Sequence, residues 1–176
     1  PAPSAPPPRA GTMFAARLLR STKMVVGVSI KDIAGAKAAM NRAIALASAS
    51  DKIVSLHIPK IVPEMMLSSM SDPGDASEET FAAIANLPAR AGGALQAEMK
   101  EAATAAMKAA GKTLDIEYVT TNPCSDVKTA ILHECRKAKA SILFLGGGVG
   151  GNGSIPPFAA SNAKGMTVCV VRDNIE

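Results

Sequence analysis

The stretch that decides the fold is SILFLGGGVGGNGSIPPF, residues 141–158. Its first six residues form a short apolar run of strand length, uniform enough to be buried on both faces of a sheet. Glycines follow, and then Ser154 and Pro156, which are typical of the first turn of a helix. A strand, a glycine-rich turn and a helix in this order predict one unit of an α/β fold.

The rest of the chain repeats this alternation. Further strands are predicted at MVVGVSI (24–30), KIVSLHI (52–58), LDIEYV (114–119) and MTVCVVR (166–172). Helices are predicted after Asp32, from Leu95 to Gly111, and after Ser125, with Asp32 and Ser125 as caps. Pro63 and Pro88 interrupt residues 60–93, where we expect a long connection with one or two short helices.

Strands that alternate with helices form a parallel sheet covered on both faces, because right-handed crossovers place the helices there. We therefore expect an α/β fold, with a single doubly wound domain. The runs at 24–30 and 141–146 are uniformly apolar and belong at the centre, whereas 114–119 alternates apolar with charged residues and belongs at an edge. Such sheets bind ligands at the carboxyl ends of central strands, where the glycines lie.

The glycine stretch permits two interpretations. Glycines before a helix expose backbone N–H groups that can hold a phosphate. The pattern is neither a Walker loop nor a dinucleotide fingerprint, however, and the local motif alone favours a flexible turn between strand and helix.

Charge and composition argue against a nucleic-acid partner. The formal net charge is +4, but Arg9, Arg17, Arg20 and Lys23 lie in a stretch without acidic residues, and the remaining chain carries 15 residues of each sign. Only four Phe and one Tyr are available to stack on bases. The predicted domain therefore lacks both the basic surface that attracts nucleic-acid phosphates and the aromatic cluster that stacks on bases. No apolar run approaches the ~20 residues that cross a bilayer, so we expect no transmembrane segment.

Residues 1–22 form a Pro-rich, basic extension before a predicted domain at 23–176. Its composition suits either the remnant of an organellar, mitochondrial targeting segment or a tail that lies on a partner. Cys124, Cys135 and Cys169 are too widely spaced for a disulfide framework or a zinc site. We therefore expect a reducing compartment, either organellar or cytoplasmic.

An enzyme is a weaker interpretation. Cys124 stands near a predicted helix start, which could lower its pKa, but no C-x-x-C pattern or nearby His supports a reactive thiol. His57 is expected to be a packing residue at a strand end. Since no carboxylate or imidazole is paired with a nucleophile, the sequence predicts no catalytic residue and no metal ligand.

The order of elements, with VVGVSI, SLHI, NPCSDVKTAILHECRKAKASILFLGG, GSI and MTVCVVR in sequence, resembles the universal stress protein family over residues 23–173. The resemblance implies a five-stranded parallel sheet of strand order 3-2-1-4-5. It also implies dimers formed through the fifth strand and, in one subgroup of the family, binding of ATP.

The ATP-binding members carry G-x-x-G after the fourth strand and, after a longer loop, Gly-Ser or Gly-Thr. By resemblance, the nucleotide-binding residues of this chain would be Ser29, Ile58, Gly147, Gly150, Gly153 and Ser154. Two features depart from the family. Only Gly151 and Asn152 separate the two halves of the loop, and Ser29 replaces an aspartate, so it brings no charge to a bound Mg²⁺.

Two functions remain open. The first is a nucleotide-binding regulatory domain that takes ATP, with or without Mg²⁺, at an altered or partly lost site. The second is a structural or accessory subunit without a cofactor, in which the extension and residues 60–93 contact a larger assembly, in an organelle or in the cytoplasm.

Overall fold

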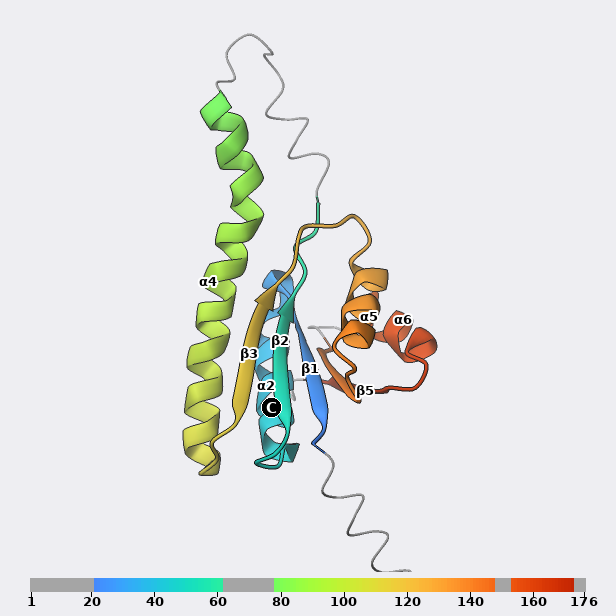
Figure 1. Cartoon of the computed structure of the whole chain (residues 1–176). Helices are drawn as coiled ribbons and strands as arrows, with labels where there is room; N and C mark the ends of the chain where they lie inside the picture. Colours follow the sequence, from blue (N-terminus) through green and yellow to red (C-terminus); the bar gives the residue numbers. More distant parts are fainter. Residues whose placement is uncertain (1–20, 62–77, 148–152, 173–176) are drawn as a thin grey trace, which may run out of the picture.

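The computed structural model describes residues 21–61, 78–147 and 153–172, and for residues 78–89 it describes the backbone alone. The elements are β1 (Lys23–Val28), a 3₁₀ turn η1 (Ile30–Asp32), α2 (Ile33–Leu46), β2 (Lys52–His57), α4 (Glu78–Ala110), β3 (Asp115–Thr120), α5 (Val127–Lys137), β4 (Ile142–Gly146), α6 (Ile155–Asn162) and β5 (Thr167–Val171). Strands and helices alternate along the chain, as the sequence predicts (Figure 1).

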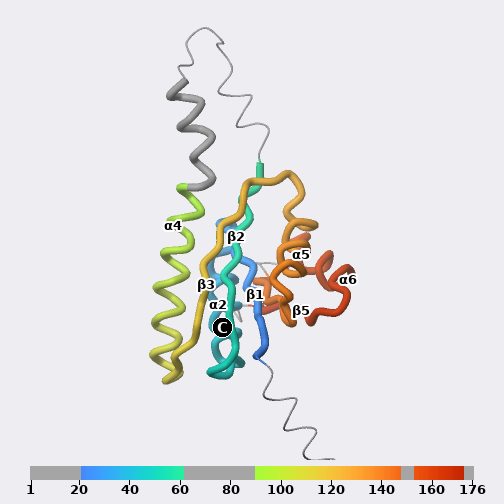
Figure 2. The backbone as a smooth tube through the Cα atoms, viewed as in Figure 1, coloured from blue at the N-terminus to red at the C-terminus, as the bar shows by residue number. Residues whose placement is uncertain are grey.

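The strands of the described part form a parallel sheet in the order β3-β2-β1-β4-β5. This order confirms the fold class and the strand order that the family resemblance implies. The buried strands β1 and β4 are neighbours, and the alternating strand β3 lies at an edge. In Figure 2, β1, β2 and β3 begin at the lower end of the view, which is the amino end of the sheet.

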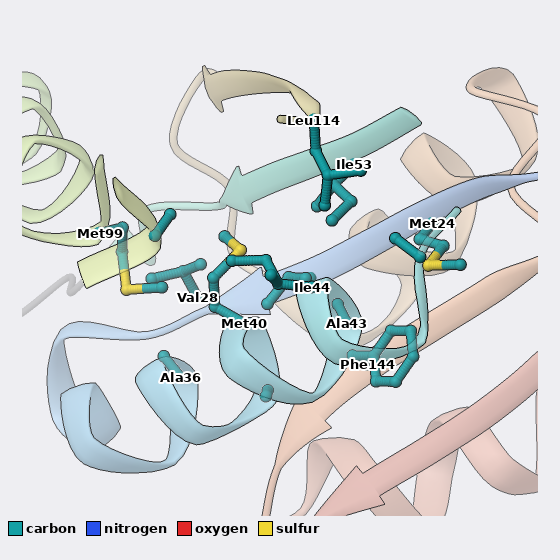
Figure 3. Packing of buried hydrophobic residues seen from close by; sticks show 14 of the residues in the cluster. Met24, Val28, Ala36, Met40, Ala43, Ile44, Ile53, Met99, Leu114 and Phe144 are labelled. Carbon is teal, nitrogen blue, oxygen red and sulfur yellow. The ribbon is translucent and has the colours of Figure 1, made fainter. Parts of the chain in front are cut away.

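Helices cover both faces of the sheet, and each face has its own core. On one face, Met40 and Ile44 of α2 pack with Val28, Ile53 and Phe144 of three strands (Figure 3). The same cluster includes Leu95 and Met99 of α4. On the other face, the inward residues of α5 and α6 pack on the strands; they are Ile131, Leu132, Cys135 and Ala159. Aliphatic side chains build most of both layers, together with Phe144 and buried methionines.

The connection predicted at residues 60–93 is wrong over its second half, because α4 already begins at Glu78. A proline inside a helix removes one backbone hydrogen bond and costs about 3 kcal/mol, which predicts a break at Pro88. The alanine-rich sequence on both sides favours helix strongly enough to continue through that position. The rest of the predicted connection, from residue 62 to 77, lies outside the described residues.

Two predicted helix caps differ in outcome. Asp32 caps α2 as expected, with its Oδ1 accepting a hydrogen bond from the Gly35 amide at 3.0 Å. The predicted cap Ser125 is wrong, because Asp126 occupies that position and accepts from the Thr129 amide at 3.2 Å. Either side chain is a good cap, and the helix begins one residue later than the serine suggests.

Candidate functional site

Three residues predicted at the site lie in one line across the central strands. Val28 of β1 pairs with His57 of β2, so Ser29 and Ile58 follow side by side. Gly27 pairs with Leu145 of β4, which places Gly147 abreast of Ser29. Because β1 lies between β2 and β4, this line crosses the position where the strand order reverses, and open α/β sheets bind ligands there.

The side chains of this line are short or apolar. Ile58 is 7 % exposed and packs among the residues of the α5 face. The Oγ of Ser29 accepts a hydrogen bond from the Lys31 amide at 3.2 Å and so caps the 3₁₀ turn. Its hydroxyl hydrogen can still donate to a ligand. The pair offers an apolar surface and one neutral donor, with no carboxylate.

The two glycines at the end of β4 are required by close packing. A Cβ atom on Gly146 would lie 2.6 Å from the carbonyl carbon of Gly35 at the start of α2. A Cβ atom on Gly147 would lie 2.9 Å from the Cγ of Arg172 and 3.3 Å from the carbonyl oxygen of Val171. Both contacts are closer than side chains allow, so these glycines serve the packing of α2 and β5 against β4.

The backbone amide of Gly147 is not free. It donates a hydrogen bond of 2.7 Å to the carbonyl oxygen of Val171, which extends the pairing of β4 with β5. The phosphate-binding role expected for this amide would require that bond to break. The same contact brings Arg172 to the site as a cationic side chain. Sequence reasoning missed Arg172, because the contact depends on the register between β4 and β5.

The start of α6 offers fewer donors than an ordinary helix. Ser154 occupies the N-cap position, but its side chain makes no cap hydrogen bond. Pro156 and Pro157 follow in the first turn and have no N–H. The donors left before them are the amides of Gly153, Ser154 and Ile155, with the Ser154 hydroxyl. Gly150 lies outside the described residues.

Gly153 has room around it. A Cβ atom there would lie 3.4 Å from the Cδ of Pro156, which is an ordinary contact distance. Within the described part of the chain, neither packing nor a positive φ requires a glycine at this position, in contrast to the close packing at Gly146 and Gly147. A ligand that comes close to the backbone would explain why glycine stands at position 153.

His57 lies on the other side of the sheet from Ile58, in keeping with a packing role. Its side chain is 4 % exposed, and its Nδ1 lies 3.0 Å from the carbonyl oxygen of Val28, to which it donates. Among the described residues its buried Nε2 has no hydrogen-bond partner. A Cβ atom on Gly92 of α4 would come within 3.1 Å of the ring.

The lowered pKa considered for Cys124 is wrong. Burial, followed by the nearby charge of Asp126, raises the pKa of this thiol, although a hydrogen bond from the backbone acts in the opposite direction. Burial also raises the pKa of Cys135 to about 12. Both thiols are therefore protonated near neutral pH and poor nucleophiles.

Within the described ranges, no three His, Cys, Asp or Glu side chains gather to hold a metal ion. Within the same ranges, no helix combines the length and apolar character needed to span a bilayer.

No family model matches this chain, and no curated protein matches it either. Solved structures do match over most of its length. A universal stress protein from Arabidopsis thaliana with AMP bound is 19 % identical, with 88 % of this chain and 93 % of that chain covered and a TM-score of 0.57. The universal stress protein UspA from Lactobacillus plantarum is 17 % identical, with 87 % and 99 % covered and a TM-score of 0.59.

This chain has the universal stress protein fold. A further universal stress protein, in complex with cAMP, is 22 % identical, with 86 % of this chain and 97 % of that chain covered and a TM-score of 0.56. At these identities the likeness shows a shared fold and not a shared binding site.

Proposed function

We propose that this chain is a regulatory domain of the universal stress protein type that binds an adenine nucleotide at the carboxyl end of its sheet. The observation that carries the proposal is the alignment of Ile58, Ser29 and Gly147 across three neighbouring strands at the reversal of strand order. Two universal stress proteins of similar fold are described with AMP or cAMP bound. No catalytic group is part of the proposal.

The donors of the site suit a nucleotide with one phosphate better than ATP with Mg²⁺. The amide of Gly147 is bonded to Val171, and two prolines reduce the donors at the start of α6. Ser29 supplies no carboxylate for a metal ion. We therefore propose that the ATP site of the family is reduced here, and that one phosphate lies between the amides of Gly153 and Ser154 and the guanidinium of Arg172.

Calorimetric titration of the full chain with AMP, cAMP and ATP, with and without Mg²⁺, tests this function. We expect saturable binding of AMP that Mg²⁺ does not strengthen, and weaker binding of ATP. Losing a charge-assisted hydrogen bond costs about 1.5–3 kcal/mol, so Arg172→Gln should weaken AMP binding by about tenfold or more. Lys100→Gln, an equal charge change at an exposed position of α4, is the control.

Gly153→Val gives a second, independent test at the same site. Among the described residues a Cβ atom at Gly153 meets only Pro156, at an ordinary contact distance, so we expect the variant to fold, while its bulk should hinder a phosphate at the neighbouring amides. If Gly153→Val and Arg172→Gln both bind AMP like the unchanged chain, the nucleotide does not occupy this site. A non-catalytic accessory role would then be the better hypothesis.

We also propose a homodimer through β5. This strand pairs with β4 on one side, has no charged residue between Thr167 and Val171, and exposes 42 % of Val170. Uncharged, unpaired edges favour association with another strand. Sedimentation of the unchanged chain should show a dimer, and Val170→Lys should shift it toward the monomer; equal sedimentation of both chains would contradict this interface.

A further inference from the structure

The amino end of the sheet carries a second candidate site, opposite to the nucleotide site. Here an open hollow of about 350 Å³ lies between the turn from α5 to β4 and the turn from α6 to β5. Its lining includes three cationic residues, Arg136, Lys139 and Lys164, and Ser141. The volume falls at the lower end of the range for small-ligand sites.

The three cations are largely unneutralised. Among the described residues, neither Lys139 nor Lys164 makes a side-chain hydrogen bond or an ion pair. Arg136 donates one bond, of 3.3 Å, to the carbonyl oxygen of Asn162, which leaves its other N–H groups for a ligand. Glu134, on the same helix, is engaged with other partners, at 3.7 Å from Lys137 and 3.4 Å from His133.

The ends of two helices oppose this positive charge but do not cancel it. Helices α5 and α6 both end beside the hollow, at Lys137 and Asn162. Each carboxyl-terminal end is equivalent to about −0.5 charge, so together they contribute about −1. The three cationic residues of the lining carry a formal charge of +3, so their sum with the two helix ends is about +2.

Lys112 caps a helix, and its hydrogen bonds differ from those of the two lysines at the hollow. The Nζ of Lys112 donates to the carbonyl oxygens of Ile44, Ala45 and Ala47, at 2.9, 2.7 and 2.9 Å, at the end of α2. The side chains of Lys139 and Lys164 make no such bonds to the ends of α5 and α6. Their charge therefore remains available.

The backbone of Lys139 is held in a conformation that favours glycine. Its φ is +54°, in the left-handed region, and the next amide, that of Ala140, donates to the carbonyl oxygen of Cys135 at 2.9 Å. Glycine is the usual residue at this position after a helix. The chain here carries a charged side chain at the rim of the hollow instead. Gly165 also lines the hollow. Apart from its two chain neighbours, no described atom lies within 4 Å of the position that a Cβ atom would take there, so a ligand can reach its backbone.

The basic extension joins the domain at the same end of the sheet. The carbonyl oxygen of Lys23, the first residue of β1, accepts a hydrogen bond of 2.8 Å from the amide of Ser141, which lines the hollow. The sequence before Lys23 contains Arg9, Arg17 and Arg20 and no acidic residue.

We propose that this hollow binds a phosphate-bearing small ligand, with its phosphate held by Arg136, Lys139, Lys164 and the hydroxyl of Ser141. An arginine fork and two lysine point charges can engage several oxygens of one phosphate at once. The site lies at the opposite end of the strands from the AMP site proposed above and does not depend on it. An added nucleotide therefore has two places to bind, which a bulk affinity measurement would not separate.

The test is a titration of the full, ¹⁵N-labelled chain with pyrophosphate, followed by NMR at low salt. We expect saturable shifts of the amides of Lys139, Ser141 and Gly165, while those of Gly153 and Ser154 stay in place. The double variant Lys139→Gly with Lys164→Gln should weaken binding about tenfold or more, because two of three cations are lost. Glycine suits the backbone at 139, so this variant should fold.

A matched control removes the same charge elsewhere, with Lys100→Gln and Lys128→Gln, and should change the affinity less than twofold. Arg172→Gln should leave pyrophosphate binding at the hollow intact while it weakens AMP binding, so the two proposals can fail separately. Equal loss of affinity in the double variant and its control would overturn the proposal, as would unsaturable shifts. A Glu-rich peptide that moves the same amides at lower concentration than pyrophosphate would also overturn it, in favour of a protein partner.

Discussion

We propose that the two ends of the sheet bind anions by different means. At the carboxyl end, Ile58, Ser29 and Gly147 lie in line across three strands, and Arg172 lies next to Gly147. At the amino end, three cationic residues line a hollow between two turns. The first end carries a recognisable sequence motif and the second does not. A sequence motif thus points to the proposed site at the carboxyl end. Cationic residues without an ion-pair partner among the described residues point to the proposed site at the amino end.

Glycines in the motif differ in what requires them. Gly146 and Gly147 are needed because α2 and β5 pack closely against β4. Gly153 has space around it and no positive φ. Among the glycines of the motif that the structure describes, packing therefore explains Gly146 and Gly147, whereas Gly153 is available for a ligand role.

The largest effect that we expect is the loss of stability on replacing Gly146 by Val. The first added atom would lie 2.6 Å from the backbone of Gly35 and 2.8 Å from the Oδ2 of Asp32, neither of which can move without disturbing the start of α2. Overpacking of this kind costs about 1–3 kcal/mol. We expect about 3 kcal/mol in urea unfolding, because the contact is with backbone.

Gly153→Val is the matched control for that experiment and should change the free energy of unfolding by less than about 0.5 kcal/mol, as at most surface positions. Equal destabilisation by the two substitutions would show that the carboxyl end is not divided into packing glycines and a ligand glycine.

The next effect concerns the amino end, where Lys112→Met removes three hydrogen bonds to the carbonyl oxygens at the end of α2. Hydrogen bonds to a charged group contribute about 1.5–3 kcal/mol, and the partial exposure of this lysine lowers the total, so we expect about 2 kcal/mol in urea unfolding. Lys108→Met, an exposed lysine in the last turn of α4, should cost only a few tenths. A similar loss in both variants would remove the distinction between capping and free lysines.

A smaller, pH-dependent effect is expected for Asp51, beside the start of β2. Burial acts to raise the pKa of its carboxyl, but hydrogen bonds from Ser48 and Thr22 outweigh it and hold the pKa below its ordinary value of 3.8. The carboxylate therefore stabilises the fold above the unfolded-state pKa, and this stability is lost as the pH falls through the lower folded-state pKa.

Asp51→Asn should destabilise the chain by about 1.5 kcal/mol at neutral pH, and the difference from the unchanged chain should shrink below pH 4. Urea unfolding at a series of pH values measures both effects. A difference that stays constant down to pH 2 would contradict the assigned hydrogen bonds.

Much of the fold could be predicted from local pattern. Uniformly apolar runs placed β1 and β4 at the centre, and the charged residues Asp115 and Glu117 placed β3 at an edge. The first half of α4 could not be predicted, because the local cost of Pro88 does not reveal how strongly the surrounding helix compensates it. The cap of α5 was missed by one residue for a similar reason, since Ser125 and Asp126 are both good caps.

The sites were less predictable, because they depend on contacts between distant segments. The glycine motif predicted a ligand at the carboxyl end, and Ser29, Ile58 and Gly147 lie side by side there. It could not show that the Gly147 amide bonds to Val171, because that bond depends on the register between two strands. The hollow at the amino end joins Lys139 and Lys164 from two separate turns, and neither lysine belongs to a motif.

The smallest effect, and the sharpest comparison of the ends, is expected at Lys139. With φ at +54°, glycine should gain about 1 kcal/mol over a side chain, whereas loss of the lysine charge at the end of α5 should cost about 0.3–1 kcal/mol. Lys139→Gly should therefore be as stable as the unchanged chain or slightly more stable. Lys139→Ala loses the charge and keeps the strain, so it should be less stable than the glycine variant by about 1 kcal/mol. Urea unfolding of both variants, next to their pyrophosphate affinities, separates strain from charge. Glycine and alanine variants of equal stability would mean that the backbone at 139 is relaxed, and the strained lysine would no longer point to a ligand.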